Sequence, residues 1–142
     1  MRTYDPQLVV TSFNGLTIDG YGPDTIIKVS RNEDGWSYQP SNSGRGARSR
    51  NPNKSGIIEI TLIRSAPANA YLSAIAVADE LRGTGVGDFL VKDLTTSSAL
   101  CESRNTWIKK FPDWERAKEI ETVTWILESD EISLKFDGTI DA

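Results

Sequence analysis

Residues 57–83 carry the sequence IIEITLIRSAPANAYLSAIAVADELRG, in which a strand pattern is followed directly by a helix pattern. In residues 57–64, isoleucine and leucine alternate with Glu59 and a threonine, which predicts a strand with one buried face. In residues 67–82 the apolar side chains recur at helical spacing, and Gly83 suits the end of a helix. This stretch therefore predicts one strand and one helix joined by a short connection.

The predicted helix is apolar on more than one side. Ser65 is expected to cap its N-terminus, with Pro67 in the first turn. Tyr71, Leu72 and Ile75 belong to its apolar stripe, and its first three turns carry no charged side chain. A helix that is apolar around most of its circumference is normally covered on most sides, which one small domain does not achieve alone. We therefore predict that Tyr71, Leu72 and Ile75 lie at an interface with a partner subunit.

The remainder of the chain contains strand patterns separated by turn signals. Asn14-Gly15 lies between apolar runs and predicts a tight β-hairpin, because a type I′ turn needs two residues with positive φ. Strands and helices do not alternate along the sequence, which argues against a parallel sheet. We predict a single domain over residues 1–142 that is mainly β, an antiparallel β-barrel or sandwich with one flanking α-helix. A polar, mobile tail is expected at 137–142. The other predicted strands are 25–31, 36–39, 88–94, 99–110 and 119–128, with a short edge strand or helical turn at 132–136.

The composition excludes several kinds of chemistry. The chain has 142 residues, of which 38% are apolar, a net charge of -4, no histidine and one cysteine. The absence of histidine removes the commonest general base and the commonest zinc ligand. Cys101 is expected to be a buried thiol, and the glycines of 83–87 are expected to end a helix rather than to bind phosphate, since the helix precedes them. We predict no catalytic residue, no metal site, no cofactor and no enzymatic activity. No apolar run approaches the roughly 20 residues of a membrane helix, so no membrane insertion is expected.

A basic segment stands out in this acidic chain. Residues 40–55 are rich in glycine, serine and asparagine, and they predict a long loop. Three roles are open for this loop: a solvated loop without function, a nucleic-acid contact, or an assembly loop that binds an acidic surface of a partner. We favour the assembly loop, because arginine pairs well with carboxylates and no aromatic residues are interleaved for base stacking. Trp36 and Trp114 lie beside predicted turns and are candidate interface aromatics. The basic residues of the loop are Arg45, Arg48, Arg50 and Lys54.

Four segments together carry a resemblance to a known family. They are EDGWSY at 33–38, RSRNPNKSG at 48–56, SAPANAYLS at 65–73, and WIKKFPD at 107–113 followed by ETVTW at 121–125. In their order and spacing these segments resemble the tail tube proteins of contractile-tailed (myovirus or Mu-like) bacteriophages. The resemblance spans about residues 5–136, and the stretch 83–87 is not part of the family's pattern.

The resemblance implies a structural virion protein that self-assembles. Such proteins form hexameric rings whose sheets join around a channel, and the rings stack into a tube that conducts double-stranded DNA inside a contractile sheath. The implied partners are further copies of the chain, the tail sheath, the baseplate and the tail terminator. The implied location is the virion tail, after synthesis in the cytoplasm of the host bacterium. In this setting the basic loop contacts a neighbouring subunit or ring.

An acidic channel avoids retention of DNA, since contacts that neutralise phosphates slow its passage. Glu59 and Glu121 lie on outward faces of strong predicted strands, and we predict that they line the channel. The nearest alternatives are a tail completion or baseplate ring protein, and the tube of a phage-derived bacteriocin or of a secretion system. A small enzyme and a β-barrel nucleic-acid binder are the alternatives from other classes.

Overall fold

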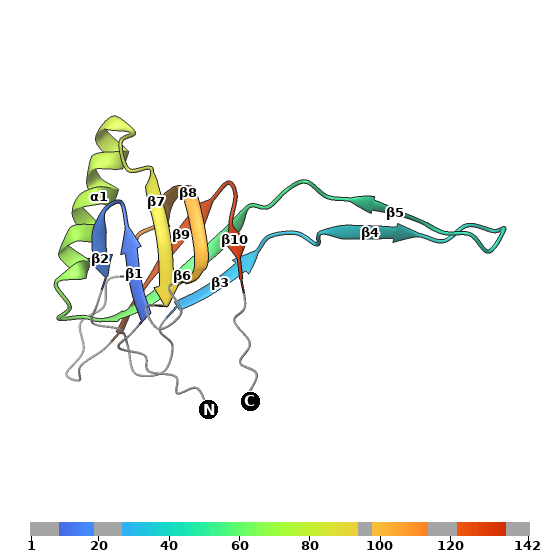
Figure 1. Cartoon of the computed structure of the whole chain (residues 1–142). Helices are drawn as coiled ribbons and strands as arrows, with labels where there is room; N and C mark the ends of the chain where they lie inside the picture. The colour runs from blue at the N-terminus through green and yellow to red at the C-terminus, as the bar shows by residue number, and fades with distance from the viewer. Residues whose placement is uncertain (1–8, 19–26, 94–97, 114–121, 136–142) are drawn as a thin grey trace, which may run out of the picture.

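A computed structural model describes residues 9–18, 27–93, 98–113 and 122–135. Within these ranges the chain forms ten strands and one helix, arranged around a curved antiparallel sheet (Figure 1). The prediction of a mainly β fold with one flanking helix is confirmed. The elements are β1 (Val9–Phe13), β2 (Leu16–Ile18), β3 (Ile27–Arg31), β4 (Trp36–Gln39), β5 (Ala47–Arg50), β6 (Gly56–Ile63), α1 (Ala68–Arg82), β7 (Gly87–Asp93), β8 (Ser98–Lys110), β9 (Thr122–Ser129) and β10 (Ser133–Leu134).

The main sheet has the strand order β2-β1-β7-β8-β9-β6-β3, and β10 adds a further pairing to β8. All strand pairs within it are antiparallel. In the described part of the chain, β2 and β3 form the two edges, so this sheet does not close on itself. Open edges present unpaired backbone groups to other chains. Strands β4 and β5 form a separate two-stranded sheet.

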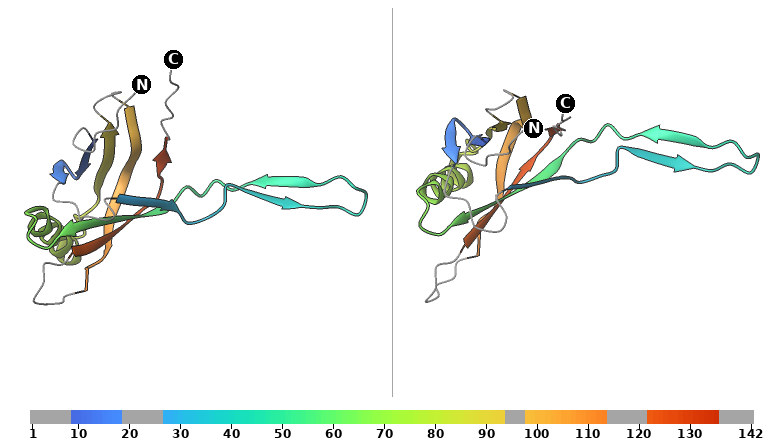
Figure 2. Two further views of the ribbon diagram at one scale, coloured as in Figure 1. Left: turned by 90° about the horizontal axis from the view of Figure 1, so that it is seen from below. Right: turned by 60° about the horizontal axis from the view of Figure 1, so that its bottom comes forward.

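The long strand β8 joins the two halves of the main sheet. On one side it pairs with β7, and on the other it pairs first with β10 and then with β9. Register shifts interrupt β8 against both β7 and β9, and such irregularities increase the local bend of a strand. Figure 2 shows that β3, β6 and β9 consequently run in a different direction from β1, β7 and β8.

Buried hydroxyl groups lie where β8 changes partners. Ser103, Thr106 and Ser129 are all buried. The hydroxyl of Thr106 donates to Ser103 Oγ at 2.8 Å, and Ser103 Oγ is also hydrogen-bonded to Ser129 Oγ. Ser129 Oγ also bonds to the backbone N–H and carbonyl of Glu131. These bonds satisfy polar groups at the irregular turn between β9 and β10, where regular strand pairing is interrupted.

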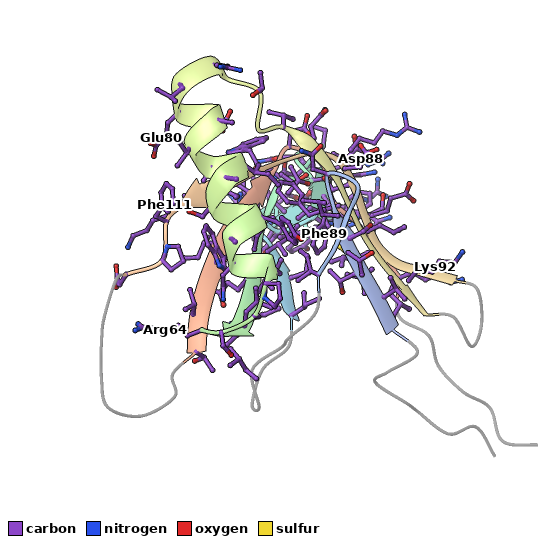
Figure 3. The ribbon with its side chains drawn as sticks, turned by 90° about the vertical axis from the view of Figure 1, so that its left-hand side faces the viewer. Arg64, Glu80, Asp88, Phe89, Lys92 and Phe111 are labelled. Carbon is purple, nitrogen blue, oxygen red and sulfur yellow. The ribbon has the colours of Figure 1, made fainter. Side chains whose placement is uncertain are left out.

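The core lies between the two halves of the sheet and α1. Its side chains come from β1, β2, β6, β7, β8, β9 and the helix, so no single hairpin contains it. The alternation in β6 leaves Ile58, Ile60 and Leu62 fully buried, as the sequence predicts. Figure 3 shows the labelled Phe89 of β7 behind α1, inside this core.

The local turns follow their sequence signals. Asn14 (φ 53°) and Gly15 (φ 81°) join β1 to β2, which confirms the predicted tight hairpin. The predicted helix is confirmed at Ala68–Arg82, and Gly83 ends it with φ 66° in the left-handed region. The predicted Ser65 cap is wrong, because Pro67 occupies the N-cap position and makes no side-chain bond there.

The side chain of Asn69 fixes the start of α1 to the sheet. Its Nδ2 donates to the carbonyl oxygens of Ile63 at 2.9 Å and of Arg64 at 3.0 Å, where β6 ends. Its Oδ1 accepts a hydrogen bond of 2.9 Å from Nε1 of Trp125, a buried residue of β9. One amide thereby joins α1, β6 and β9, and it also satisfies the indole N–H of the buried tryptophan.

The replacement Asn69→Leu is expected to lower the free energy of unfolding by about 1–3 kcal/mol, because the buried indole N–H of Trp125 loses its acceptor. The measurement is urea unfolding followed by tryptophan fluorescence. The control is Asn105→Leu, since Asn105 is exposed and its side-chain amide bonds to the exposed carboxylate of Asp130. An equal effect of the two variants would contradict the role given to Asn69.

Candidate functional site

Few of the described residues carry groups suited to catalysis or to metal binding. Cys101 is buried, and its desolvation raises the pKa of the thiol to about 11, so the thiol stays protonated at neutral pH. Within the ranges that the structure describes, no three Cys, Asp or Glu side chains lie close enough together to hold a metal ion. Over the same ranges, no helix has both the length and the apolar character needed to cross a bilayer.

The glycines after the helix form a turn, as predicted. The backbone N–H of Gly83 donates to the carbonyl of Asp79 at 2.8 Å, and that of Gly85 donates to the Asp79 carboxylate at 3.0 Å. The N–H groups of these two glycines are thus used inside the chain to close the end of α1.

The most prominent surface feature is a long hairpin, here called the arm and defined as residues 32–55. It contains β4 and β5, and it projects beyond the body on the side away from α1 (Figures 1 and 2). The expectation of a loop over 40–55 needs correction, because Ala47–Arg50 is a strand paired with Trp36–Gln39. All eight strand residues are exposed; Trp36 and Tyr38 alternate with polar residues in β4, whereas Ala47–Arg50 lacks the apolar alternation by which a strand is usually predicted.

The two faces of the arm differ in chemistry. Trp36 pairs with Arg50, and Tyr38 pairs with Arg48, so these four side chains share one face. We call this set the aromatic–arginine face. The guanidinium of Arg48 lies 3.9 Å from the ring centroid of Trp36, a cation–π contact. Trp36 is 51% exposed and Tyr38 is 66% exposed. The opposite face carries only Ser37, Gln39, Ala47 and Ser49.

A set of hydrogen bonds holds the base of the arm together. The carboxylate of Glu33 accepts from Nδ2 of Asn51 at 2.9 Å and from Nδ2 of Asn53 at 2.8 Å. These two bonds lower the pKa of the Glu33 carboxyl below its ordinary value. Across the same hairpin, the backbone N–H of Asn51 donates to the carbonyl of Gly35 at 2.8 Å.

Two further contacts attach the base to the body. The backbone of Lys54 forms an isolated parallel β-bridge with Glu131, and the Lys54 carbonyl accepts a hydrogen bond from the N–H of Ile132 at 2.9 Å. The guanidinium of Arg31 donates to the carbonyl of Ile132 at 2.8 Å. Because Ile132 is fully buried, the arm begins from a fixed part of the fold rather than from a free loop.

The second feature is the side of α1 that faces away from the sheet. Leu72 is only 2% exposed and packs in the core, so its predicted place at a subunit interface is wrong. Ile75 is partly buried against the same core, whereas Tyr71 is exposed. Opposite the buried residues runs a second apolar stripe, which lines a shallow groove. We call it the outer face of α1, and it consists of Ala70, Ala74, Val77 and Leu81.

The structure places some of the predicted residues apart from these two features. Glu59 lies on β6, half-buried, on the sheet face opposite the core and directly across from Lys28 of β3. Glu128 of β9 has its carboxylate 3.3 Å from the ammonium of Lys109, so the described part of this face carries both charges. Glu121 and Trp114 lie outside the described residues.

Of the predicted basic residues, Arg48 and Arg50 come together with Trp36 on the aromatic–arginine face. Arg45 lies in the turn at the tip of the arm, and Lys54 lies at its base. Sequence reasoning missed Tyr38, although its position two residues after Trp36 places both on one side of a strand. Val77 and Leu81 were not among the predicted interface residues, although their spacing in the helix puts them on the same side.

Comparisons with known proteins give a likeness of fold. No model of a known protein family matches the chain, and a search of curated proteins found no match. Among solved structures, the chain is similar to the sheath/tube terminator of the PVC extracellular contractile injection system in its extended state. The TM-score is 0.65 at 10% identity, over 96% of this chain and 99% of that one.

Two further solved structures match over nearly the same length. The tube-terminating cap of the anti-feeding prophage gives a TM-score of 0.60 at 9% identity, covering 96% of this chain and 93% of that one. A chain of the PVC sheath–tube complex gives 0.58 at 11% identity, covering 94% and 91%. The fold is therefore that of contractile injection system tail proteins. This agrees with the expected class of fold but does not single out the phage tail tube.

The hydrogen bonds that Glu33 accepts predict that the structure at the base of the arm depends on pH. Because the pKa of Glu33 is lowered in the folded chain, its stabilising contribution is present above the ordinary glutamate pKa and is lost as pH falls through the lowered value. In an NMR titration, the side-chain amide signals of Asn51 and Asn53 are expected to move together in this acidic range. The variant Glu33→Gln is expected to lack that shared transition, and its persistence in this variant would assign it to another group.

Proposed function

We propose that the chain is a structural subunit of a contractile tail that assembles with further copies of itself into hexameric rings, and that these rings stack into the inner tube. Its partners are then the surrounding sheath, the baseplate and the terminator, and double-stranded DNA passes through the channel without being held. The particle is a phage tail, made in the cytoplasm of the host bacterium. The fold shared with contractile injection system proteins supports this class of role.

The observation that carries the proposal is the arm. An isolated two-stranded hairpin is marginally stable in water, and the strands of the arm bury no side chain within their own chain. A contact with a neighbouring subunit supplies the burial that the arm lacks. Residues 36–54 carry four positive side chains and no negative one, and subtracting +4 from the net charge of -4 leaves -8 on the other residues. A second copy therefore offers charge of the opposite sign.

A second candidate function is a ring that ends the tube. Two of the solved structures similar to this chain, with TM-scores of 0.65 and 0.60, are a sheath/tube terminator and a tube-terminating cap. A terminating ring needs one face that binds the tube, whereas a stacking ring needs two complementary faces. Negative-stain electron microscopy of the purified protein over a concentration series separates the two candidates, since only the tube subunit is expected to give hollow stacks. Single rings at all concentrations support the terminator, and monomers throughout contradict self-assembly.

The triple replacement Arg48→Ala, Arg50→Ala and Lys54→Ala is expected to yield rings or monomers where the unchanged protein forms long tubes. The physical reason is the loss of arginine and lysine pairing to carboxylates of a neighbouring ring. Tube length in electron micrographs is the measurement. The control removes three cations outside the arm, Lys92→Ala, Arg104→Ala and Lys110→Ala. Tubes of normal length from the arm variant would remove these residues from the mechanism.

The pair Glu59→Lys and Glu121→Lys is expected to make assembled tubes retain DNA, with a retention that falls steeply as salt rises, since added cations on a channel wall contact phosphates. Retention is measured by co-sedimentation of tubes with linear duplex DNA. The pair Asp88→Lys and Asp113→Lys makes the same charge change at exposed positions outside β6 and β9. Equal retention by both pairs would mean that Glu59 and Glu121 do not line the channel.

A further inference from the structure

In the described part of the chain, two exposed surfaces lack a covering element, and they lie at opposite ends of it. The aromatic–arginine face is carried on the arm, and the outer face of α1 is at the other end of the body (Figures 1 and 2). Because the arm points away from α1, the two surfaces of one chain do not meet each other. They are able to meet between two copies, in a head-to-tail contact that repeats from copy to copy. Contacts of this kind close into rings or extend as filaments.

The outer face of α1 has the character of a buried surface. Ala70, Ala74, Val77 and Leu81 lie directly opposite the core residues of the same helix, so α1 is apolar on both sides. Leu81 is 78% exposed and Val77 is 44% exposed. A surface helix of a soluble domain normally carries polar residues on its outer side, and a helix that is apolar all round is normally buried.

The chemistry of the two surfaces is complementary. Small alanine side chains and the larger Val77 and Leu81 form a groove, which suits flat aromatic rings such as those of Trp36 and Tyr38. The lining of this groove also includes Ser73 and the cationic Arg82, whereas the exposed Glu80, labelled on α1 in Figure 3, is not part of it. Charge complementarity is therefore a property of the whole chain, in which residues 36–54 carry +4 and the other residues of a neighbouring copy carry -8.

We propose that the aromatic–arginine face of the arm of one copy binds the outer face of α1 of a neighbouring copy. This inference rests on the proposed self-assembly and names the two surfaces that carry it. Trp36 and Tyr38 enter the groove between Ala74, Val77 and Leu81. The opposite face of the arm, which carries Ser37 and Ser49, points away from the contact.

Photo-crosslinking tests the contact directly. The photoreactive amino acid p-benzoylphenylalanine replaces Tyr38 in one sample and Ser37 in the control, so that the two probes lie on opposite faces of the same strand. Isotopically labelled and unlabelled copies are mixed before irradiation, and cross-linked peptides are identified by mass spectrometry. We expect the probe at position 38 to give mixed-label cross-links to residues 70–81, and the probe at position 37 to give none there.

A matched pair of valine variants tests the groove. Val77 and Val86 have similar exposure, 44% and 49%, but Val86 lies after the helix and outside the groove lining. Val77→Asp is expected to reduce the position-38 cross-link by about tenfold or more, because an aspartate in an apolar contact is costly to desolvate. Val86→Asp is expected to leave it unchanged. Both variants are checked for an unaltered thermal unfolding midpoint, which confirms that the fold is retained.

The outcomes separate this inference from the proposed function. Rings or tubes in electron micrographs without a cross-link to α1 overturn the inference and leave the proposed function standing. A cross-link to α1 between copies that form neither rings nor tubes supports the inference and overturns the proposed function. Absence of both assembly and cross-link at every concentration contradicts both. Equal loss of the cross-link in the two valine variants also overturns the inference.

Discussion

The body of this protein depends on the pairing of β8 with three other strands. One side of β8 holds β7, and the other side holds β10 and then β9, so both halves of the sheet are built on the same thirteen residues. A strand that changes partner interrupts the regular ladder, and buried polar groups at such a point need other bonds. Ser103, Thr106 and Ser129 provide them. The bend of the sheet, the enclosed core and the position of α1 all follow from this joint.

The same arrangement leaves strand edges unpaired and apolar side chains exposed in the isolated chain. Among the described residues, the main sheet has open edges at β2 and β3, α1 is apolar on its outer face, and no other element covers the arm. Each of these features is a liability for an isolated domain. Together they are expected of a subunit that completes its burial by contact with other copies. Under the proposed self-assembly, stability and assembly are linked, since the free subunit retains exposed apolar area that the assembled one covers.

The base of the arm is attached to the rest of the fold, whereas the β4–β5 hairpin beyond it is exposed. Its base is fixed by Glu33, by the backbone bonds of Asn51 and Lys54, and by the buried Ile132. Beyond this base the arm is held by the β4–β5 ladder, by the contact of Arg48 with Trp36 and by hydrogen bonds among Ser41, Ser43 and Gly44 in its turn. A segment fixed at one end in this way has a defined direction before it meets a partner. Less conformational freedom is then lost on binding, which favours assembly.

The sequence by itself determined the elements whose pattern has a local physical cause. One buried face produces the alternation of β6, the helical spacing and Gly83 define α1, and Asn14-Gly15 fixes the first hairpin. It also excluded histidine chemistry and pointed to the basic segment and to Trp36 as surface features. Only the tertiary structure decided that Leu72 faces the core while Val77 and Leu81 face outward, because an apolar stripe does not state which of its sides meets the sheet. The strand at Ala47–Arg50 was equally inaccessible to pattern reasoning, since its four residues contain no apolar alternation, and its role in two distinct faces appears only through pairing with β4.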